Sequence, residues 1–161
     1  MAVIESRTDG IRVIQMGYWR PSCHRWSCRI GELFESIEGW LQTYLPDAVV
    51  MEEVFIHPAH PRSGMVLQQI TGAIEAALAH HGYSWVTYPT TVIKQAITGS
   101  GRANKLTLRR RLRLLIPDLD SLNGYPADAW DALAVAICHA FQRGEPTPAH
   151  AHPNEQTGGH P

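Results

Sequence analysis

The sequence predicts an α/β protein, in which strands form a sheet that is covered by helices. Three observations support this fold class. The chain opens with two strand-like segments joined by an Asp9-Gly10 turn, strand and helix patterns alternate after them, and the last helical segment is apolar along most of its length. Alternation of this kind is typical of sheets whose faces are covered by helices.

The N-terminal third of the chain predicts three strands and one long helix. Asp9-Gly10 is a strong hairpin-turn dipeptide, so the segments on either side of it are expected to pair. Apolar residues at helical spacing follow, and then a short, almost wholly apolar run that is typical of a buried central strand. The expected strands are residues 2–6, 11–18 and 48–55, and the expected helix is residues 30–44.

The remainder of the chain predicts four helices and one further strand. Gly82 and Gly99 are expected to end the first two of these helices, because glycine readily adopts the conformation that follows a helix. Residues 144–161 are rich in proline and histidine without apolar periodicity, so we expect one domain over residues 1–143 and a disordered tail. The expected helices are residues 65–78, 90–98, 105–116 and 126–142, and the expected strand is residues 84–88.

Composition excludes several classes of protein. The 161 residues suffice for one domain with a core, and the longest apolar run, 132–138, is too short to span a bilayer. Charged residues within the first dozen positions exclude a secretion signal. Three cysteines, an odd number, argue against a disulfide framework and for a reducing compartment. We therefore expect a cytoplasmic globular protein.

The charges are distributed unevenly along the chain. The formal net charge is −1, yet residues 76–117 contain no Asp or Glu and hold 7 of the 14 Lys and Arg residues. Such clustering beside an acidic remainder indicates a polyanionic partner, with nucleic acid first, while a solvated basic helix face is the alternative.

Three carboxylates are candidate ligands for a metal ion. Glu52 lies near the end of an apolar strand pattern, and Asp128 and Asp131 share one face at the start of the last helix. Oxygen ligands that converge from a strand end and a helix start suit Mg²⁺, and two such ions support hydrolysis of a phosphodiester. The structural alternatives are a solvated glutamate at the sheet edge and two aspartates that complement the helix dipole.

The other polar candidates lie in or near the basic segment. Lys94 and Lys105 flank the loop 99–104 and are suited to contacts with phosphate, although that loop does not complete a dinucleotide-binding motif. Phe55 would stack on an unpaired base if it is exposed, and a position in the core is the alternative. His139 is expected to be a packed, hydrogen-bonded histidine rather than a ligand.

Three segments, in their order and spacing, resemble the bacterial Holliday-junction resolvases of the RuvC family. They are MEEVF at 51–55, VIKQAITGSGRANK at 92–105 and DAWDALAVAICH at 128–139, and the agreement extends over residues 2–142. The resemblance implies an RNase H-like mixed sheet flanked by helices and a homodimer. It also implies Mg²⁺-dependent hydrolysis, with two ions per site, that nicks opposed strands of a four-way DNA junction in recombination and repair. The branch-migration proteins RuvA and RuvB are then expected partners.

Residue by residue, the resemblance implies roles for the candidates above. Glu52, Asp128 and Asp131 match the family's catalytic and metal-binding carboxylates. Lys94 and Lys105 match the lysines near the scissile phosphate. The residues expected to contact DNA are the stacking aromatic Phe55 and the basic residues Arg102, Arg109 and Arg110.

The sequence departs from the family pattern in three places. The loop after Phe55 is rich in proline, and Trp130 stands where the family generally has a small residue. The family's first strand, whose aspartate before Pro-Gly supplies another metal ligand, has no counterpart here. Asp9 does not replace that aspartate, because it lies in the hairpin turn. We therefore expect a reading frame that extends upstream of Met1, and a chain without that strand to lose most of its rate.

Two other functions fit these features. One is a catalytically silent junction-binding protein, and the other is an RNase H-like nuclease that acts on another structured nucleic acid. Three acidic residues beside a phosphate-binding segment favour an enzyme, because a protein that only binds DNA gains nothing from them. We therefore expect an endodeoxyribonuclease that resolves four-way junctions.

Overall fold

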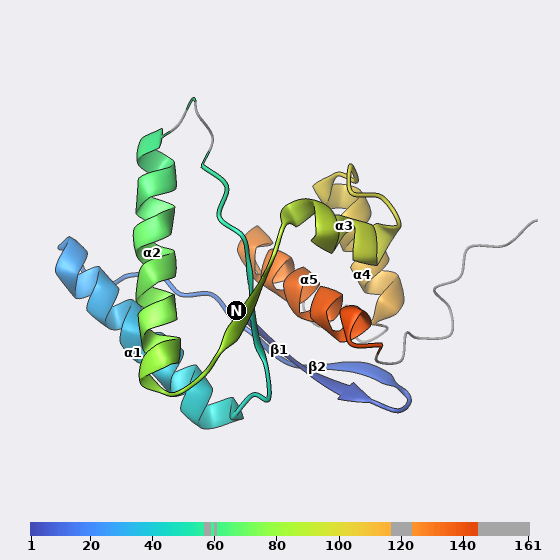
Figure 1. The fold of residues 1–161 in the computed structure, drawn as a ribbon, viewed down its shortest axis with the longest axis horizontal. Coiled ribbons are helices and arrows are strands. Elements are labelled where there is room, and N and C mark those ends of the chain that lie inside the picture. The colour runs from blue at the N-terminus through green and yellow to red at the C-terminus, as the bar shows by residue number, and fades with distance from the viewer. Residues whose placement is uncertain (57–58, 60, 117–123, 145–161) are drawn as a thin grey trace, which may run out of the picture.

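The computed structural model describes residues 1–56, 59, 61–116 and 124–144. Helices α1 and α2 lie together on one side of the molecule, and α3, α4 and α5 lie on the other (Figure 1). In chain order the elements are β1 (Ala2–Arg7), β2 (Gly10–Met16), α1 (Trp26–Tyr44), β3 (Val49–Glu52), α2 (Pro61–His80), β4 (Trp85–Tyr88), α3 (Thr90–Thr98), α4 (Lys105–Leu115) and α5 (Ala127–Gln142).

The strands form two separate two-stranded sheets. β1 pairs antiparallel with β2, and β3 pairs parallel with β4. Gly10, with φ at +139°, follows Asp9 in the tight turn between β1 and β2, as the Asp-Gly dipeptide predicts. The predicted α/β class is confirmed, and both parallel and antiparallel pairing occur. Within the described residues, however, the sheet is in two pieces, because no strand lies between β1 and β3.

The larger core is centred on α5. The first turns of this helix carry the two aspartates. The residues after them bury mostly small and branched side chains against β1, β2, α3 and α4. Leu133, Ala134 and Ile137 are completely buried. The buried residues of α5 are Ala129, Trp130, Leu133, Ala134, Val135, Ile137, Cys138 and Ala140.

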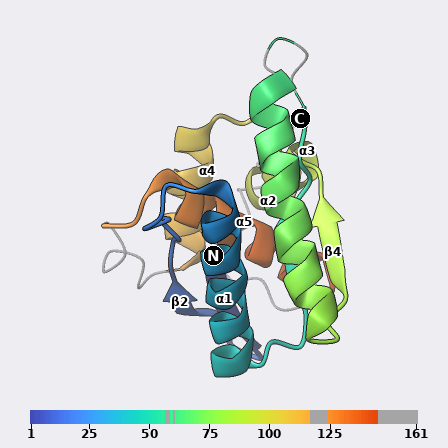
Figure 2. The same cartoon turned by 90° about the vertical axis from the view of Figure 1, so that its left-hand side faces the viewer.

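A second core lies between α1 and α2, which run side by side (Figure 2). Leu33, Ile37 and Leu41 recur on one face of α1 and pack against Ala77 and Leu78 of α2. Val49 and Met51 of β3 pack against this cluster, whereas Val50 packs against the larger one, as the alternation of side chains along a strand requires. No helix in the described part of the chain is long and apolar enough to cross a membrane.

Three element boundaries differ from the predicted ones by three residues or more. Helices α1 and α2 begin earlier, at Trp26 and Pro61, because their first turns are largely exposed and do not extend the apolar spacing of the rest of each helix. Proline is favoured at the first position of a helix, where its missing N–H costs nothing. Strand β3 ends at Glu52 rather than at Phe55, so the segment after Glu52 leaves the sheet.

The expectation that the chain has no disulfide framework is corrected by one pair. Cys23 and Cys28 form a disulfide, whereas Cys138 is free and buried in α5. The two paired residues flank the start of α1, and the turn between them brings their Cα atoms to 6.1 Å, within the range of a disulfide. Most of the predicted tail, residues 145–161, lies outside the described residues.

Candidate active site

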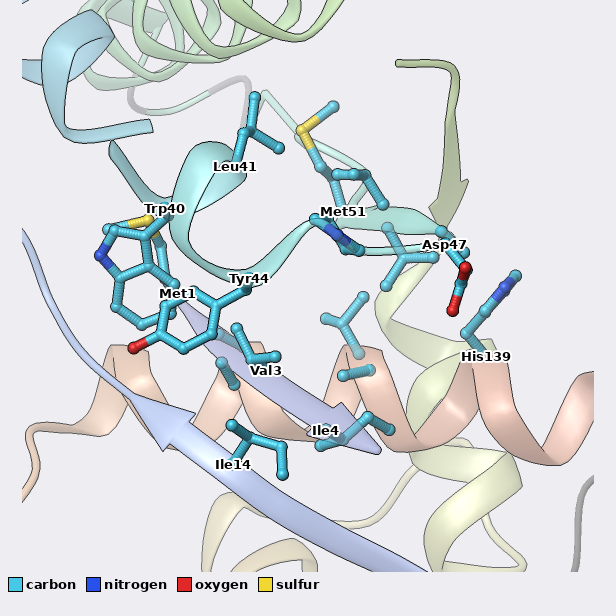
Figure 3. A pocket seen from close by; sticks show the side chains of 18 of the residues that line it. Met1, Val3, Ile4, Ile14, Trp40, Leu41, Tyr44, Asp47, Met51 and His139 are labelled. Atoms are coloured by element: carbon cyan, nitrogen blue, oxygen red, sulfur yellow. The ribbon is translucent and has the colours of Figure 1, made fainter. Parts of the chain in front are cut away.

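A cavity of about 1220 Å³ lies between strands β1 and β3. Figure 3 shows Leu41 and Met51 on one side of it and Val3 and Ile4 on the other, with α5 passing along it. The three carboxylates singled out in the sequence all line this cavity: Glu52, Asp128 and Asp131. The cavity therefore borders both the strand end and the helix start that carry these carboxylates.

Glu52 is the last residue of β3, and its side chain is exposed. The Thr90 hydroxyl donates a hydrogen bond to its Oε1. The parallel register pairs Glu52 with Tyr88, so the first residue of α3 reaches the carboxylate after a short connection. Thr90 is a site residue that the sequence analysis missed, because its proximity depends on the pairing of β3 with β4 and leaves no local signal.

The two aspartates project from the first turns of α5. Asp128 is exposed, and the Asp131 carboxylate accepts a hydrogen bond from Lys105 Nζ at 3.1 Å. The amino group of Met1 also lies within the electrostatic field of Asp128 and donates to the Gly17 carbonyl oxygen at 2.7 Å. Burial lowers the pKa of that amino group, and the negative charge of Asp128 opposes the shift.

The carboxylates suit a divalent cation by chemistry, but they do not form a closed cluster. Among the residues that the structure describes, no three His, Cys, Asp or Glu side chains lie close enough together to hold a metal ion. Asp131 is engaged by Lys105 and Glu52 by Thr90, so both already have a donor. A shared metal site for the three residues therefore stays a prediction.

The predicted lysines lie on neighbouring helices. Lys105, at the start of α4, reaches the site directly through Asp131, and its side chain is 71% exposed, which leaves it accessible to a phosphate. Lys94 lies half-buried on α3, which packs against both α4 and α5. The structure thus brings one of the two lysines into contact with the acidic residues.

Asn104 fixes the start of α4 and with it the position of Lys105. Its side-chain oxygen accepts a hydrogen bond from the Thr107 backbone N–H at 2.9 Å. We expect Asn104→Ala to lower the free energy of unfolding by about 0.5–2 kcal/mol, because an N-terminal donor of the helix loses its partner. Urea unfolding would measure the loss. Asn104→Asp should retain most of the stability, and an equal loss in both variants would contradict this role.

Trp130 links the acidic start of α5 to the basic helix α4. It is only 3% exposed, and the guanidinium carbons of Arg109 and Arg113 lie 5.9 Å and 5.6 Å from the centre of its ring. Both distances are within the range of a cation–π interaction. The large residue between Asp128 and Asp131 therefore packs in the core and holds two basic side chains beside the site.

Phe55 lies beyond the end of β3 and is 76% exposed, so the alternative that it is a core residue is wrong. Arg102 and Arg110 are also exposed, whereas Arg109 is half-buried against Trp130. An exposed aromatic side chain and exposed guanidinium groups are suited to unpaired bases and to phosphates respectively.

His139 is hydrogen-bonded, as expected. The Tyr88 hydroxyl and His139 Nδ1 lie 2.8 Å apart, which joins the end of β4 to α5 beside the cavity. Burial raises the pKa of Tyr88, so its phenol stays protonated at neutral pH. This contact ties the sheet that carries Glu52 to the helix that carries the aspartates.

Comparison with known proteins identifies relatives of this site and fold. The family model described as "Crossover junction endodeoxyribonuclease RuvC" matches residues 1–139. The chain is 40% identical to the crossover junction endodeoxyribonuclease RuvC of Polynucleobacter necessarius over 113 residues, which are 70% of this chain and 64% of that protein. It is 32% identical to the protein of the same name from Burkholderia multivorans, over 86% of this chain and 74% of that protein. The chain thus spans roughly two thirds to three quarters of the length of these relatives.

Two solved structures share the fold. A structure of T. thermophilus RuvC in complex with a Holliday junction substrate superposes with a TM-score of 0.74 at 23% identity, over 88% of this chain and 86% of that one. A second Thermus thermophilus RuvC structure superposes with a TM-score of 0.69 at 22% identity, over 88% of this chain and 84% of that one. The predicted RNase H-like arrangement is therefore confirmed.

Proposed function

The chain belongs to the RuvC family of crossover junction endodeoxyribonucleases, and we propose on this basis that it is a structure-specific endonuclease that resolves four-way DNA junctions. One observation carries the proposal. Glu52, Asp128 and Asp131, which stand in the family's motifs, line a single cavity, and Lys105 at the start of the basic helix α4 is bonded to one of them. This is the arrangement expected where a phosphodiester meets a hydrolytic site.

The proposed reaction is in-line attack of water on phosphorus. Glu52, Asp128 and Asp131 would hold divalent cations, Mg²⁺ with two ions expected, which when bound stabilise the attacking and leaving oxygens. The Lys105 ammonium would neutralise charge that develops on the phosphate oxygens. Thr90 orients Glu52 through its hydrogen bond, and Arg109 and Arg113 hold Trp130 in place between the two aspartates.

The basic helix α4 and Phe55 provide the proposed DNA surface. Lys94, Arg102, Arg109 and Arg110 would contact phosphates, and exposed Phe55 would stack on a base at the branch point.

Arg110 offers a direct test of this surface because it is exposed and is not among the residues that line the cavity with Glu52, Asp128 and Asp131. We expect Arg110→Ala to weaken binding to junction and duplex DNA alike, and to reduce the slope of log K against log salt by about 1. Fluorescence anisotropy at several salt concentrations would measure both. Arg12→Ala, in strand β2, is the matched control and should leave the slope unchanged. An equal change in both variants would contradict the assignment.

The proposed assembly is a homodimer that works in the cytoplasm with RuvA and RuvB. Resolution requires paired nicks, so two sites must act on one junction. Helix α2 exposes three consecutive apolar residues near its start, Met65, Val66 and Leu67, and this segment would serve as the contact between the two copies.

The proposed activity is tested with a synthetic four-way junction, labelled on each strand in turn, incubated with the chain and Mg²⁺. We expect paired nicks at symmetric positions near the branch point, no nicks in linear duplex of the same sequence, and no reaction in EDTA. Tight binding without nicks would favour the silent junction-binding protein. Faster cleavage of another branched or RNA-containing substrate would favour the second alternative.

A further inference from the structure

The connection from β2 to α1, together with the first turn of that helix, carries a second concentration of positive charge. Residues 17–31 contain no Asp or Glu and hold three arginines, Arg20, Arg25 and Arg29. Two aromatic side chains lie among them on the surface, since Tyr18 is 48% exposed and Trp26 is 37% exposed. Arginines beside aromatic rings, without acids between them in the sequence, are typical of surfaces that bind polyanions.

The start of this connection is packed tightly on α1. Gly17 lies so close to the helix that a Cβ atom at this position would be 2.6 Å from the ring of Trp40. Trp19 packs against the core between α1 and α2. The residues next to these two contacts, Tyr18 and Arg20, are exposed. The backbone is therefore held from one side, and these two side chains are presented to solvent on the other.

A second set of contacts holds the end of the connection to the first turns of α1. The Ser22 backbone N–H donates to Glu32 Oε2 at 2.8 Å, and the Ser22 hydroxyl donates to Glu32 Oε1. The hydroxyl bond, and after it the backbone bond, lowers the pKa of Glu32, so this carboxylate is ionised at neutral pH and keeps both bonds. The disulfide between Cys23 and Cys28 closes the remaining turn. A surface that is fixed in this way loses less conformational entropy when it binds a ligand.

The aromatic rings orient two of the three arginines. The guanidinium carbon of Arg20 lies 4.9 Å from the centre of the Tyr18 ring, and that of Arg29 lies 5.5 Å from the centre of the Trp26 ring. Both distances are within the range of a cation–π interaction. Stacking on a ring restricts the plane of the guanidinium group, whose N–H groups lie in that plane and suit the paired oxygens of a phosphate.

The connection begins beside the candidate site. The Gly17 N–H donates to the Met1 carbonyl oxygen at 2.9 Å, and the amino group of Met1 lies within the electrostatic field of Asp128. In Figure 1 the chain runs down through α1 and rises again through residues 49–52, so the start of α1 and the end of β3 point the same way. Helix α4 lies on the other side of the molecule (Figure 1). The two basic segments therefore flank the carboxylates from opposite sides.

We propose that Arg20, Arg25 and Arg29 bind the phosphate backbone of a DNA duplex arm that extends from the candidate site on the side away from α4. This inference rests on the proposed junction cleavage, which supplies the DNA arms. Guanidinium groups bind phosphate oxygens through paired hydrogen bonds, and a duplex presents phosphates at regular spacing to several arginines at once. These contacts reach phosphates rather than base edges, so the arm is held without regard to its sequence.

Arg20→Ala tests this surface, because Arg20 is exposed and makes none of the contacts that hold the connection to α1. We expect the variant to bind a four-way junction more weakly and to reduce the slope of log K against log salt by about 1. Fluorescence anisotropy at several salt concentrations would measure both. Arg12→Ala, in strand β2, should keep the slope of the unaltered chain, and so should Arg20→Lys, which keeps the charge. An unchanged slope in Arg20→Ala, or an equal loss in either of the other variants, would overturn the proposal.

Single-turnover nicking separates this surface from the candidate site. With Arg20→Ala, half-maximal nicking should require more protein, while the rate at saturation stays within about twofold of that of the unaltered chain. A large loss of the saturating rate with unchanged binding would overturn the proposal. Circular dichroism checks that each variant is folded. If the unaltered chain binds junctions without nicking them, the proposed cleavage fails, and the salt slopes still decide whether Arg20 contacts DNA.

Discussion

Asp128→Asn is expected to slow the nicking of a four-way junction at least about 100-fold while junction binding stays within about twofold. The substitution keeps the size of the side chain, removes its charge and replaces one acceptor oxygen with an NH2 donor. Asp128 is exposed at the start of α5, so the fold should tolerate the change. Loss of one group that stabilises transition-state charge typically costs 10²–10³ in rate. Single-turnover cleavage and anisotropy would measure the two quantities separately.

Asp9→Asn is the matched control for this prediction. Asp9 lies in the hairpin turn between β1 and β2, does not line the cavity, and is followed by Gly10, so Asn-Gly keeps the same turn preference. The nicking rate of this variant should equal that of the unaltered chain. A similar loss in both variants, or unchanged nicking by Asp128→Asn, would remove Asp128 from the proposed site.

Leu133→Ala is expected to lower the free energy of unfolding by about 2–5 kcal/mol. Leu133 is completely buried in the middle of α5, where the strands β1 and β2 and the helices α3 and α4 meet. Its truncation removes apolar contacts and leaves a cavity that the surrounding helices fill only in part. Urea unfolding followed by circular dichroism would measure the change.

Leu114→Ala removes the same atoms from a surface position and serves as the control. Leu114 is 64% exposed on α4, so its truncation should change the free energy of unfolding by less than about 0.5 kcal/mol. A small effect of Leu133→Ala would mean that α5 is not the centre of the core. Comparable effects at the two positions would contradict the difference in burial.

Much of the fold follows from local patterns in the sequence. Asp9-Gly10 predicted the hairpin, and the apolar periodicity of residues 30–44 and 126–142 predicted the two helices that centre the cores. The first turns of α1 and α2 were missed because they are largely exposed and do not extend the apolar spacing of the helices. The division of the sheet into two pairs also had no local signal, since strand order depends on contacts between distant segments.

The residues of the candidate site could be predicted from the sequence, but the contacts between them could not. Glu52, Asp128 and Asp131 were found because acids interrupt apolar segments; all three line the cavity, but within the described residues they do not lie close enough together to hold a metal ion. The Thr90 hydrogen bond to Glu52 depends on the parallel register of β3 and β4, which residues 38 positions apart do not reveal. The exposure of Phe55 depends on where β3 ends, and the apolar run 48–55 suggested a later end than the observed one.

The two elements that carry the candidate site, α5 and β3, differ in how readily they unfold locally. Asp131 is carried by the helix that forms the centre of the larger core, so releasing it requires a large part of the molecule to unfold. Glu52 ends a four-residue strand with one paired side, and its backbone can exchange with solvent through local fluctuations that leave the core intact. Amide hydrogen exchange in α5 would therefore report global stability, while exchange in β3 would report local opening of the strand. Asp131 is therefore held by a segment that opens only with the whole core, whereas Glu52 is held by a strand that can open locally.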